Sequence, residues 1–411
     1  MNRPYEANIW KFYLFQFLLN LQLWWPIWVL YLTEKRGLTL GQVTLMDVPF
    51  WLSIVLLQIP AAAIADRWGR KPTLIAAALS LSAAVTLFGL ASSFPLLLLC
   101  YLIWGTSLAL LFGTESAFLY DTLKALGREE DYSRIYGRAW GLVTAATLAG
   151  TLLGAPLAAE TDLALPILLS AAIASLAVLV ALAFAEPKIE GAVRRHLTYT
   201  QVIRESVQIV RRQPAVRYGI LFFGLIAIGG TAPIFFFQPF LREHDIGLGA
   251  VGFWQTPSRI AGIIGAVAAY RIIAFAGERQ TFYLMPLVIV LSYVALAAWD
   301  SVYAQVAFIS INFVAFLSQP TVTDYLNRRV PSEQRATVIS LTNLVRSAIL
   351  IPVAPLLGAL AEESLAASFW AGAAIVATLG LPLMLAWSPY LRREAPLEPE
   401  LPQPAAVPGG D

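Results

Sequence analysis

Four ionisable side chains lie in stretches that are otherwise apolar, namely Asp47, Glu115, Arg259 and Arg346. On insertion scales a charge at the centre of a membrane helix costs about 2.5–3.5 kcal/mol, so such residues have a function or a partner. The two carboxylates are candidate proton-binding sites, and Glu115 is the preferred one. Glu115 could instead form a structural ion pair or hydrogen bond, and Asp47 could belong to an outer gate or interact with a helix dipole. The two arginines could pair with these acids across the molecule or bind an anionic group of a ligand.

The composition indicates the environment of these charges. Of the 411 residues, 58% are hydrophobic and only 13% are charged, and the mean hydropathy is +0.68. A soluble domain is about one quarter charged, so soluble enzymes and nucleic-acid-binding proteins are excluded. The net charge of +2 indicates no polyanionic partner. Two histidines and one cysteine provide few metal ligands, and we expect neither a metal nor a cofactor.

The apolar stretches predict an all-α membrane protein. A transmembrane helix needs about 20 mostly apolar residues, and continuous apolar runs of that length exclude a β-barrel. The first run is expected to be one permanent helix, because it has no signal-peptide cleavage pattern. Twelve runs qualify, at residues 10–32, 42–65, 73–92, 95–120, 138–159, 163–185, 217–240, 248–273, 281–299, 302–325, 337–361 and 365–388.

The basic residues predict the orientation of the chain. Loops on the cytoplasmic side of a membrane are enriched in Lys and Arg. If the N-terminus is cytoplasmic, only Lys35, Arg36 and Arg242 fall on the outer side. We therefore expect a multi-pass protein of the cytoplasmic (inner) membrane with both termini inside.

The longest polar break divides the spans into six and six. Residues 1–185 and 217–388 are the expected bundles, and 186–216 is a cytoplasmic linker, either solvated or holding a short surface helix. The tail at 389–411 is rich in Pro and Glu and is expected to be disordered. The two halves also share weak sequence matches, such as Asp121 with Asp324, which suggest an internal repeat.

Residues 62–74, AAIADRWGRKPTL, resemble the most diagnostic motif of the major facilitator superfamily, G-x-L-x-D-R-x-G-R-K/R-x-x-L. The resemblance extends over residues 8–388 and implies two pseudo-symmetric six-helix bundles. It also implies that Arg70 pairs with Asp121 and that Asp66 faces the start of the eleventh span, which holds the halves together on the cytoplasmic side. The alternative is a basic loop with a glycine turn. The residues expected to form this conformational gate are Asp66, Arg67, Gly69, Arg70, Lys71 and Asp121.

The fifth span contains Gly141, Gly150 and Gly154 at the spacing found in exporters of this superfamily. Small residues on one helix face also allow close helix packing, so packing alone is the alternative.

In this superfamily, spans one, four, seven and ten line a central cavity. Amides and aromatic side chains on these spans suit an amphipathic ligand, although aromatic residues also face lipid or form an interfacial belt. The expected cavity residues are Tyr13, Gln16, Asn20, Trp24, Gln238, Arg259, Asn312, Phe316, Gln319 and Arg346.

These features predict a secondary active transporter that works by alternating access. The leading hypothesis is proton-coupled export of amphipathic small molecules, as in a multidrug-type antiporter. An importer of an organic anion, or a lipid or lysolipid flippase, is the alternative, and a non-transporting membrane sensor is more remote. The chain has no catalytic motif, so an enzyme is not expected. The expected partners are a small-molecule substrate, protons and the lipid bilayer, with no nucleic acid, and the resemblance implies a monomer.

Overall fold

The computed structural model describes residues 3–187, 211–330 and 332–391, and every regular element in these ranges is a helix. Eleven helices in the described ranges are long and apolar enough to cross a membrane. The remaining expected span begins with the polar first turns of α1, which contain Arg3, Glu6 and Lys11. Most of the expected linker helix and most of the C-terminal tail, at 188–210 and 392–411, lie outside the described residues.

The first bundle contains the six N-terminal spans, some of them divided into two elements. Its elements are α1 (Arg3–Asn20), α2 (Trp28–Leu30), η1 (Tyr31–Lys35), α3 (Leu40–Leu45), α4 (Asp47–Trp68), α5 (Arg70–Leu90), α6 (Phe94–Leu111), α7 (Thr114–Ala125), η2 (Glu129–Asp131), α8 (Tyr132–Glu160) and α9 (Leu165–Leu182).

The second bundle contains the six C-terminal spans. Its elements are α11 (Pro214–Gly229), η3 (Ala232–Phe236), α12 (Phe237–Glu243), η4 (Leu248–Ala250), α13 (Val251–Ala276), α14 (Glu278–Ala298), η5 (Val302–Gln305), α15 (Val306–Asn327), α16 (Ser332–Glu363) and α17 (Leu365–Leu391).

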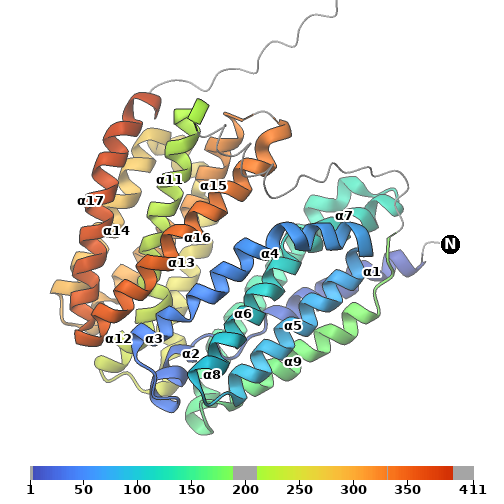
Figure 1. Ribbon diagram of the computed structural model, residues 1–411, viewed down its shortest axis with the longest axis horizontal. Helices are drawn as coiled ribbons and strands as arrows, with labels where there is room; N and C mark the ends of the chain where they lie inside the picture. The colour runs from blue at the N-terminus through green and yellow to red at the C-terminus, as the bar shows by residue number, and fades with distance from the viewer. Residues whose placement is uncertain (1–2, 188–210, 331, 392–411) are drawn as a thin grey trace, which may run out of the picture.

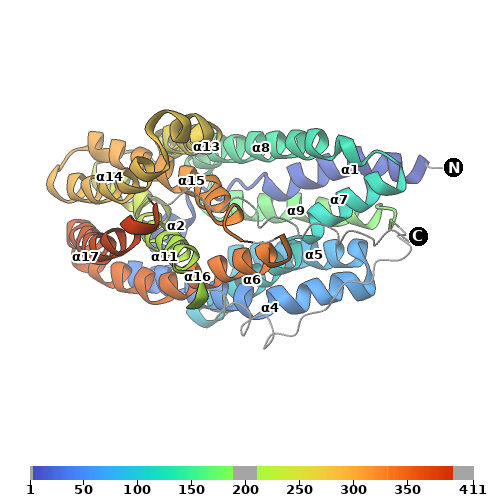
Figure 2. The ribbon, with the colours of Figure 1, turned by 90° about the horizontal axis from the view of Figure 1, so that it is seen from above.

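The two bundles meet at one end of the molecule and diverge toward the other (Figure 1). We call the end that contains α2, α3 and α12 the closed end, and the end that contains α7 and the Gly69 turn the open end. Seen from above, α8 of the first bundle reaches α13 of the second, while α5 and α9 lie on the opposite side of the molecule from α14 and α17 (Figure 2).

The first span is not the continuous helix predicted for 10–32. α1 ends at Asn20, residues 21–27 are irregular, and the short helix α2 begins at Trp28. Pro26 lacks a backbone N–H, which weakens any helix through this segment. Irregular backbone at membrane depth needs partners within the protein, and Ser170 provides one by accepting a hydrogen bond from the N–H of Leu23 at 2.8 Å.

Glycines of α8 make room for this irregular segment. A Cβ atom on Gly150 would lie 2.6 Å from the carbonyl oxygen of Gln22, and one on Gly154 would collide with that of Leu23. Around Gly141, by contrast, a Cβ atom would meet open space. The glycine pattern of the fifth span therefore has a direct packing role at two of its three positions.

The fourth span is also interrupted, contrary to the continuous helix predicted for 95–120. α6 ends at Leu111, and α7 begins at Thr114 after Gly113, whose φ of +79° is in the left-handed region. A residue with a side chain rarely adopts this conformation, so glycine permits the break. As a result, Glu115 lies in the first turn of a new helix.

The seventh span is interrupted next to its Gly and Pro residues. After Gly230 the chain forms a π-helix at Ala232–Phe236, with Pro233 in its first turn. Pro320 of the tenth span, in contrast, lies within the single helix α15.

The contacts of α8 predict different effects for two similar substitutions. Gly154→Ala should destabilise the protein by about 1–3 kcal/mol, because its Cβ atom would overlap the backbone at Leu23. Gly141→Ala is the matched control on the same helix and should be neutral or slightly stabilising. The midpoints of thermal unfolding in detergent measure both effects, and equal midpoints would contradict this packing account.

Candidate functional site

The closed end is held by two glutamines of the second bundle that bind the irregular part of the first span. The Gln238 Oε1 atom accepts hydrogen bonds from the N–H groups of Val29 at 2.9 Å and Leu30 at 3.4 Å. The Gln238 Nε2 atom donates to the carbonyl of Trp25 at 3.1 Å. Gln255 donates to the carbonyl of Pro26, also at 3.1 Å. The backbone groups freed by the broken helix thus find their partners across the bundle interface.

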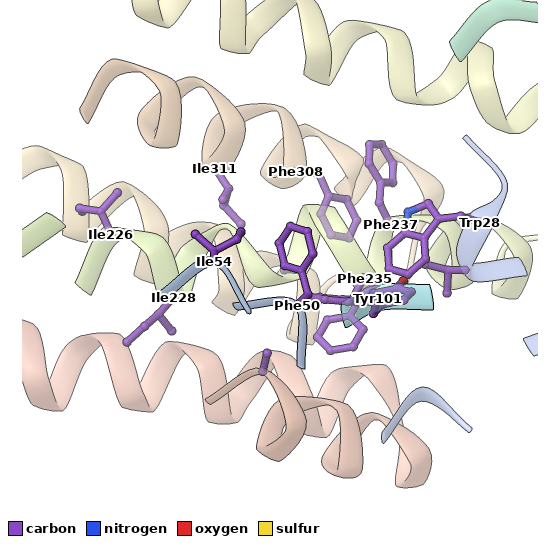
Figure 3. Close-up of a cluster of buried hydrophobic side chains, with 14 of the residues drawn as sticks. Trp28, Phe50, Ile54, Tyr101, Ile226, Ile228, Phe235, Phe237, Phe308 and Ile311 are labelled. Atoms are coloured by element: carbon purple, nitrogen blue, oxygen red, sulfur yellow. The ribbon is translucent and has the colours of Figure 1, made fainter. Parts of the chain in front are cut away.

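Polar and aromatic contacts around these glutamines complete the closure. Arg242 donates to Glu34 at 2.9 Å, and Glu362 accepts from the N–H of Gly41 at 3.0 Å. The rings of Trp28 and Phe235 meet edge to face with centroids 5.5 Å apart, beside the stacked pair Phe237–Phe308 (Figure 3).

Within the described ranges, all hydrogen bonds between the two bundles involve residues 25–41 of the first bundle, at the closed end. The structure is therefore a conformation in which the two bundles are bonded to each other at the closed end and diverge toward the open end.

A cavity of about 510 Å³ lies between the bundles next to this closure. Eight of the residues expected at functional sites line it, namely Asn20, Asp47, Gln238, Arg259, Asn312, Phe316, Gln319 and Arg346. Sequence reasoning missed several other lining residues, and the most distinctive of them are Trp25, Trp28, Trp51, Trp140, Thr144, Thr147, Thr231, Gln255 and Ser258.

The two cavity arginines rest on aromatic rings. The Arg259 guanidinium lies 5.4 Å from the ring centre of Trp25, and that of Arg346 lies 5.1 Å from Trp51 and 5.9 Å from Phe223. Such cation–π contacts contribute about 0.5–2 kcal/mol. The Nε atoms of both arginines are buried without a hydrogen-bond partner in the described part of the chain. Neither arginine lies within 4.0 Å of a described carboxylate, so the ion pairs with Asp47 or Glu115, one of the two alternatives from sequence, are not formed in this state.

Asp47 is the acid among the lining residues, at the first position of α4. Its Oδ2 atom accepts a hydrogen bond from the indole N–H of Trp51 at 3.0 Å. Trp51 therefore connects the two charged residues, with its ring under Arg346 and its N–H on Asp47.

The polar wall of the second bundle is fixed by a short chain of hydrogen bonds. Asn312 donates to the hydroxyl of Ser258 at 2.6 Å, and Ser258 donates to the carbonyl of Phe308 at 3.2 Å. Phe316 and Gln319, on the same helix as Asn312, are exposed and line the cavity.

Of the predicted cavity and proton-coupling residues, four lie outside the cavity lining: Tyr13, Gln16, Trp24 and Glu115. Gln16 is buried and donates a 2.5 Å hydrogen bond to the carboxylate of Glu115. Tyr13 packs at the edge of the hydrophobic core. Trp24 is buried among Trp25, Phe88 and Trp104, because the break after Asn20 moves it off the helical face it was predicted to share.

The motif residues form a charge cluster at the open end. Arg70 lies 2.7 Å from Asp66 and 3.5 Å from Asp121, the partner that the family resemblance implies. Gly69, with φ of +106°, makes the turn between α4 and α5. Arg67 and Lys71 flank this cluster, with Arg67 exposed and Lys71 half-buried.

Glu186 is a part of this cluster that the sequence did not indicate. Its two carboxylate oxygens accept the backbone N–H groups of Arg70 and Lys71, each at 2.7 Å, and so cap the start of α5. A Cβ atom on Gly69 would lie 2.8 Å from this carboxylate. Only the fold brings Glu186 to this turn, since more than one hundred residues separate the two.

The second bundle contains the same arrangement with its charges exchanged. Gly277, with φ of +80°, precedes Glu278, whose carboxylate lies 3.4 Å from Arg329. The same interval along the chain separates Gly69 from Gly277, Arg70 from Glu278, and Asp121 from Arg329. The match of Asp121 with Asp324, each within four residues of the end of its helix, stays a prediction.

Two helical bundles around a polar cavity, joined at one end and apart at the other, are the architecture of a membrane transporter for small molecules. A sequence profile described as Major Facilitator Superfamily matches residues 12–355. The chain belongs to this superfamily and is a multi-pass membrane protein and secondary transporter.

Solved structures share the fold at low sequence identity. The crystal structure of the nucleoside transporter NupG aligns with a TM-score of 0.78 and 12% identity, over 92% of this chain and 98% of that chain. A bacterial homologue of the human lysosomal transporter Spinster, in an inward-facing and unoccupied conformation, aligns with a TM-score of 0.75 and 17% identity, over 96% and 99%. A POT family transporter with a bound peptide conjugate gives 0.70 and 13%, over 94% and 97%. No curated protein matches the sequence. These likenesses show the fold alone.

The contacts at the closed end predict the effect of removing one glutamine. Gln238→Leu removes three hydrogen bonds to the first span and should open the closed end, because buried backbone groups left without partners cost about 1–3 kcal/mol each. Spin labels on cysteines at the exposed positions Thr161 and Asp245 should then move farther apart. Cys100 is the only natural cysteine and is buried, so the labels attach selectively.

The control is Gln280→Leu, which replaces an exposed glutamine of α14 away from the closure. This variant should keep the original label distances. Unchanged distances in Gln238→Leu as well would show that the glutamine does not hold the closed end.

Proposed function

We propose that this protein transports amphipathic small molecules with an anionic group and that it works by alternating access. The observation that carries the proposal is the pair Arg259 and Arg346, whose Nε atoms have no hydrogen-bond partner in the described residues although they are buried. A buried donor without a partner is costly, and an anionic ligand would supply the missing acceptors.

The charge balance of the cavity supports an anion rather than a cation. Its described lining contains the cations Arg259 and Arg346 and the acid Asp47. A carboxylate, sulfonate or phosphate matches the planar fork of a guanidinium group. The surrounding tryptophans, Trp28 and Trp140 among them, provide apolar surface for the rest of the molecule. These features favour the organic-anion alternative over the lipophilic cations that many multidrug exporters carry.

The distribution of basic residues supports a cytoplasmic location for the open end and for both termini, in the cytoplasmic (inner) membrane. We propose export as the direction, which the exporter-type spacing of Gly141, Gly150 and Gly154 supports. Closing the open end would bring the Asp66 turn toward the start of α16, which is the contact that the family resemblance implies. The cavity is built by a single chain, which supports a functional monomer.

Glu115 and Asp47 are the proposed proton-coupling residues. Glu115 lies two residues after the break at Gly113 and binds Gln16 of the first span. Protonation removes the charge of this hydrogen bond and weakens it, since charge-assisted bonds are the stronger kind. A proton on Glu115 would therefore loosen α7 from α1, near the cavity wall at Asn20.

The proposal predicts that the arginines determine which ligands bind. In lipid nanodiscs, hexyl sulfonate should bind more tightly than hexyltrimethylammonium. Arg259→Gln and Arg346→Gln should each weaken binding of hexyl sulfonate by about tenfold or more, the loss expected for one charge-assisted hydrogen bond. Arg271→Gln, an exposed position on the same helix as Arg259, is the control. Calorimetry gives the dissociation constants, and equal affinity of the two probes in the wild type would contradict an anion site.

Proton coupling is tested separately in everted membrane vesicles with an imposed pH gradient. Addition of hexyl sulfonate should dissipate the gradient with the wild-type protein. Glu115→Gln should abolish this proton flux because the isosteric amide cannot carry a proton, whereas Glu160→Gln, at an exposed position, should retain it. Normal flux in Glu115→Gln would exclude Glu115 as the proton carrier.

A further inference from the structure

A row of aromatic side chains on α8 connects the cavity to Glu115. Tyr132, Tyr136 and Trp140 follow one another at intervals of one helical turn. The rings of Tyr132 and Tyr136 are stacked with centroids 5.3 Å apart, and those of Tyr136 and Trp140 meet edge to face at 6.3 Å. Tyr120 of α7 extends the row, with its ring 5.8 Å from that of Tyr132. We call these four residues the aromatic row.

Glu115 lies beside this row without a cationic partner. Its carboxylate accepts a hydrogen bond from Gln16, and no described Lys, Arg or His nitrogen lies within 4.0 Å of it. Its neighbour Ser116 forms a 2.7 Å hydrogen bond with Tyr132, which fixes α7 against α8. The Glu115 carboxylate therefore has no described cationic partner, and it lies next to the contact of α7 with the aromatic row.

Two paths of one helical turn link this carboxylate to the cavity. On α1, Gln16 contacts Glu115, and Asn20, four residues later, lines the cavity and donates to the Gln16 carbonyl at 2.8 Å. On α8, Trp140 follows Tyr136 by four residues, lines the cavity and is 51% exposed. One turn of helix rises about 5.4 Å, so Glu115 lies within reach of a ligand that also occupies the cavity.

A carboxylate next to a row of electron-rich rings can bind an ammonium or quaternary ammonium group, which the rings attract through their faces. The arginine pair, which lines the cavity itself, is suited to an anion. We propose that the substrate is a zwitterion, with its anionic group at Arg259 and Arg346 and its ammonium group at Glu115, Tyr136 and Trp140. This inference rests on the proposed anion site. The proton and the ammonium group of the substrate would then compete for the Glu115 carboxylate, because one proton must leave Glu115 when one ammonium group binds there.

The test uses two probes of the same shape and a different charge. Hexylphosphocholine is a zwitterion, and hexyl dimethylbutyl phosphate is its anionic analogue, in which carbon replaces the quaternary nitrogen. Wild-type protein in nanodiscs should bind the zwitterion about tenfold more tightly or better. Glu115→Gln should reduce this ratio to about one, and Trp140→Leu should reduce it in part. Glu160→Gln should keep the wild-type ratio.

The possible results separate this inference from the proposed function. Equal binding of the two probes to the wild type would overturn the zwitterion site and leave the anion site intact. A preference that persists in both Glu115→Gln and Trp140→Leu would overturn the assignment to these residues. If Glu115→Gln does not fold, Trp140→Leu decides alone, because its side chain is half exposed. A different result would show that the proposed function is wrong: Arg259→Gln would then bind both probes as tightly as the wild type does.

Discussion

The closed state depends on how the broken first span satisfies its backbone. In the core of a membrane, no water is present to form hydrogen bonds with peptide groups, so an irregular segment needs partners from the protein. Gln238 and Gln255 supply those partners from the other bundle, at 2.9–3.4 Å. The backbone of the first span thus needs the second bundle for its hydrogen bonds. If the bundles separate at this end, water or other donors and acceptors have to replace the two glutamines.

The same segment also forms a wall of the cavity, which links binding to closure. Trp25 offers its carbonyl to Gln238 and its ring to Arg259. An anion that draws the Arg259 guanidinium away from this ring changes the packing of the residue that the glutamine holds. Gln255 and Arg259 are one helical turn apart on α13, so a shift of this turn acts on the gate and on the ligand site together. Coupling between the two sites therefore needs no long pathway.

The sequence was sufficient for the features that depend on composition and local pattern. Hydropathy located the spans, and the motif at 62–74 identified the fold and the contact between Arg70 and Asp121. The interruptions at 21–27 and Gly113 were missed, since hydropathy is equally high in a straight and in a broken helix. Trp24 was misplaced for that reason.

Other features of the site depend on contacts between residues far apart in the chain. The role of Glu186 was invisible in the sequence, because a carboxylate next to a linker shows no sign of the helix that it caps. Gln238 was recognised as an amide in an apolar span, but its partners belong to a break that was itself unforeseen. The aromatic row escaped notice because its members matter only beside Glu115.

The ion pairs at the open end lie within each bundle, which allows each bundle to move as one body. At the open end, Arg70 and Asp121 tie α5 to α7 within the first bundle, and Glu278 and Arg329 tie α14 to the end of α15 within the second. Both pairs lie inside a bundle and can persist while the bundles separate or approach. The hydrogen bonds across the interface lie at the other end, at residues 25–41 of the first bundle. Each such bond contributes about 0.5–1.5 kcal/mol net, so the closed end can open if contacts at the open end replace a few of them. A reversible rocking motion follows from this division, because the strong ties are internal and the ties between bundles are few.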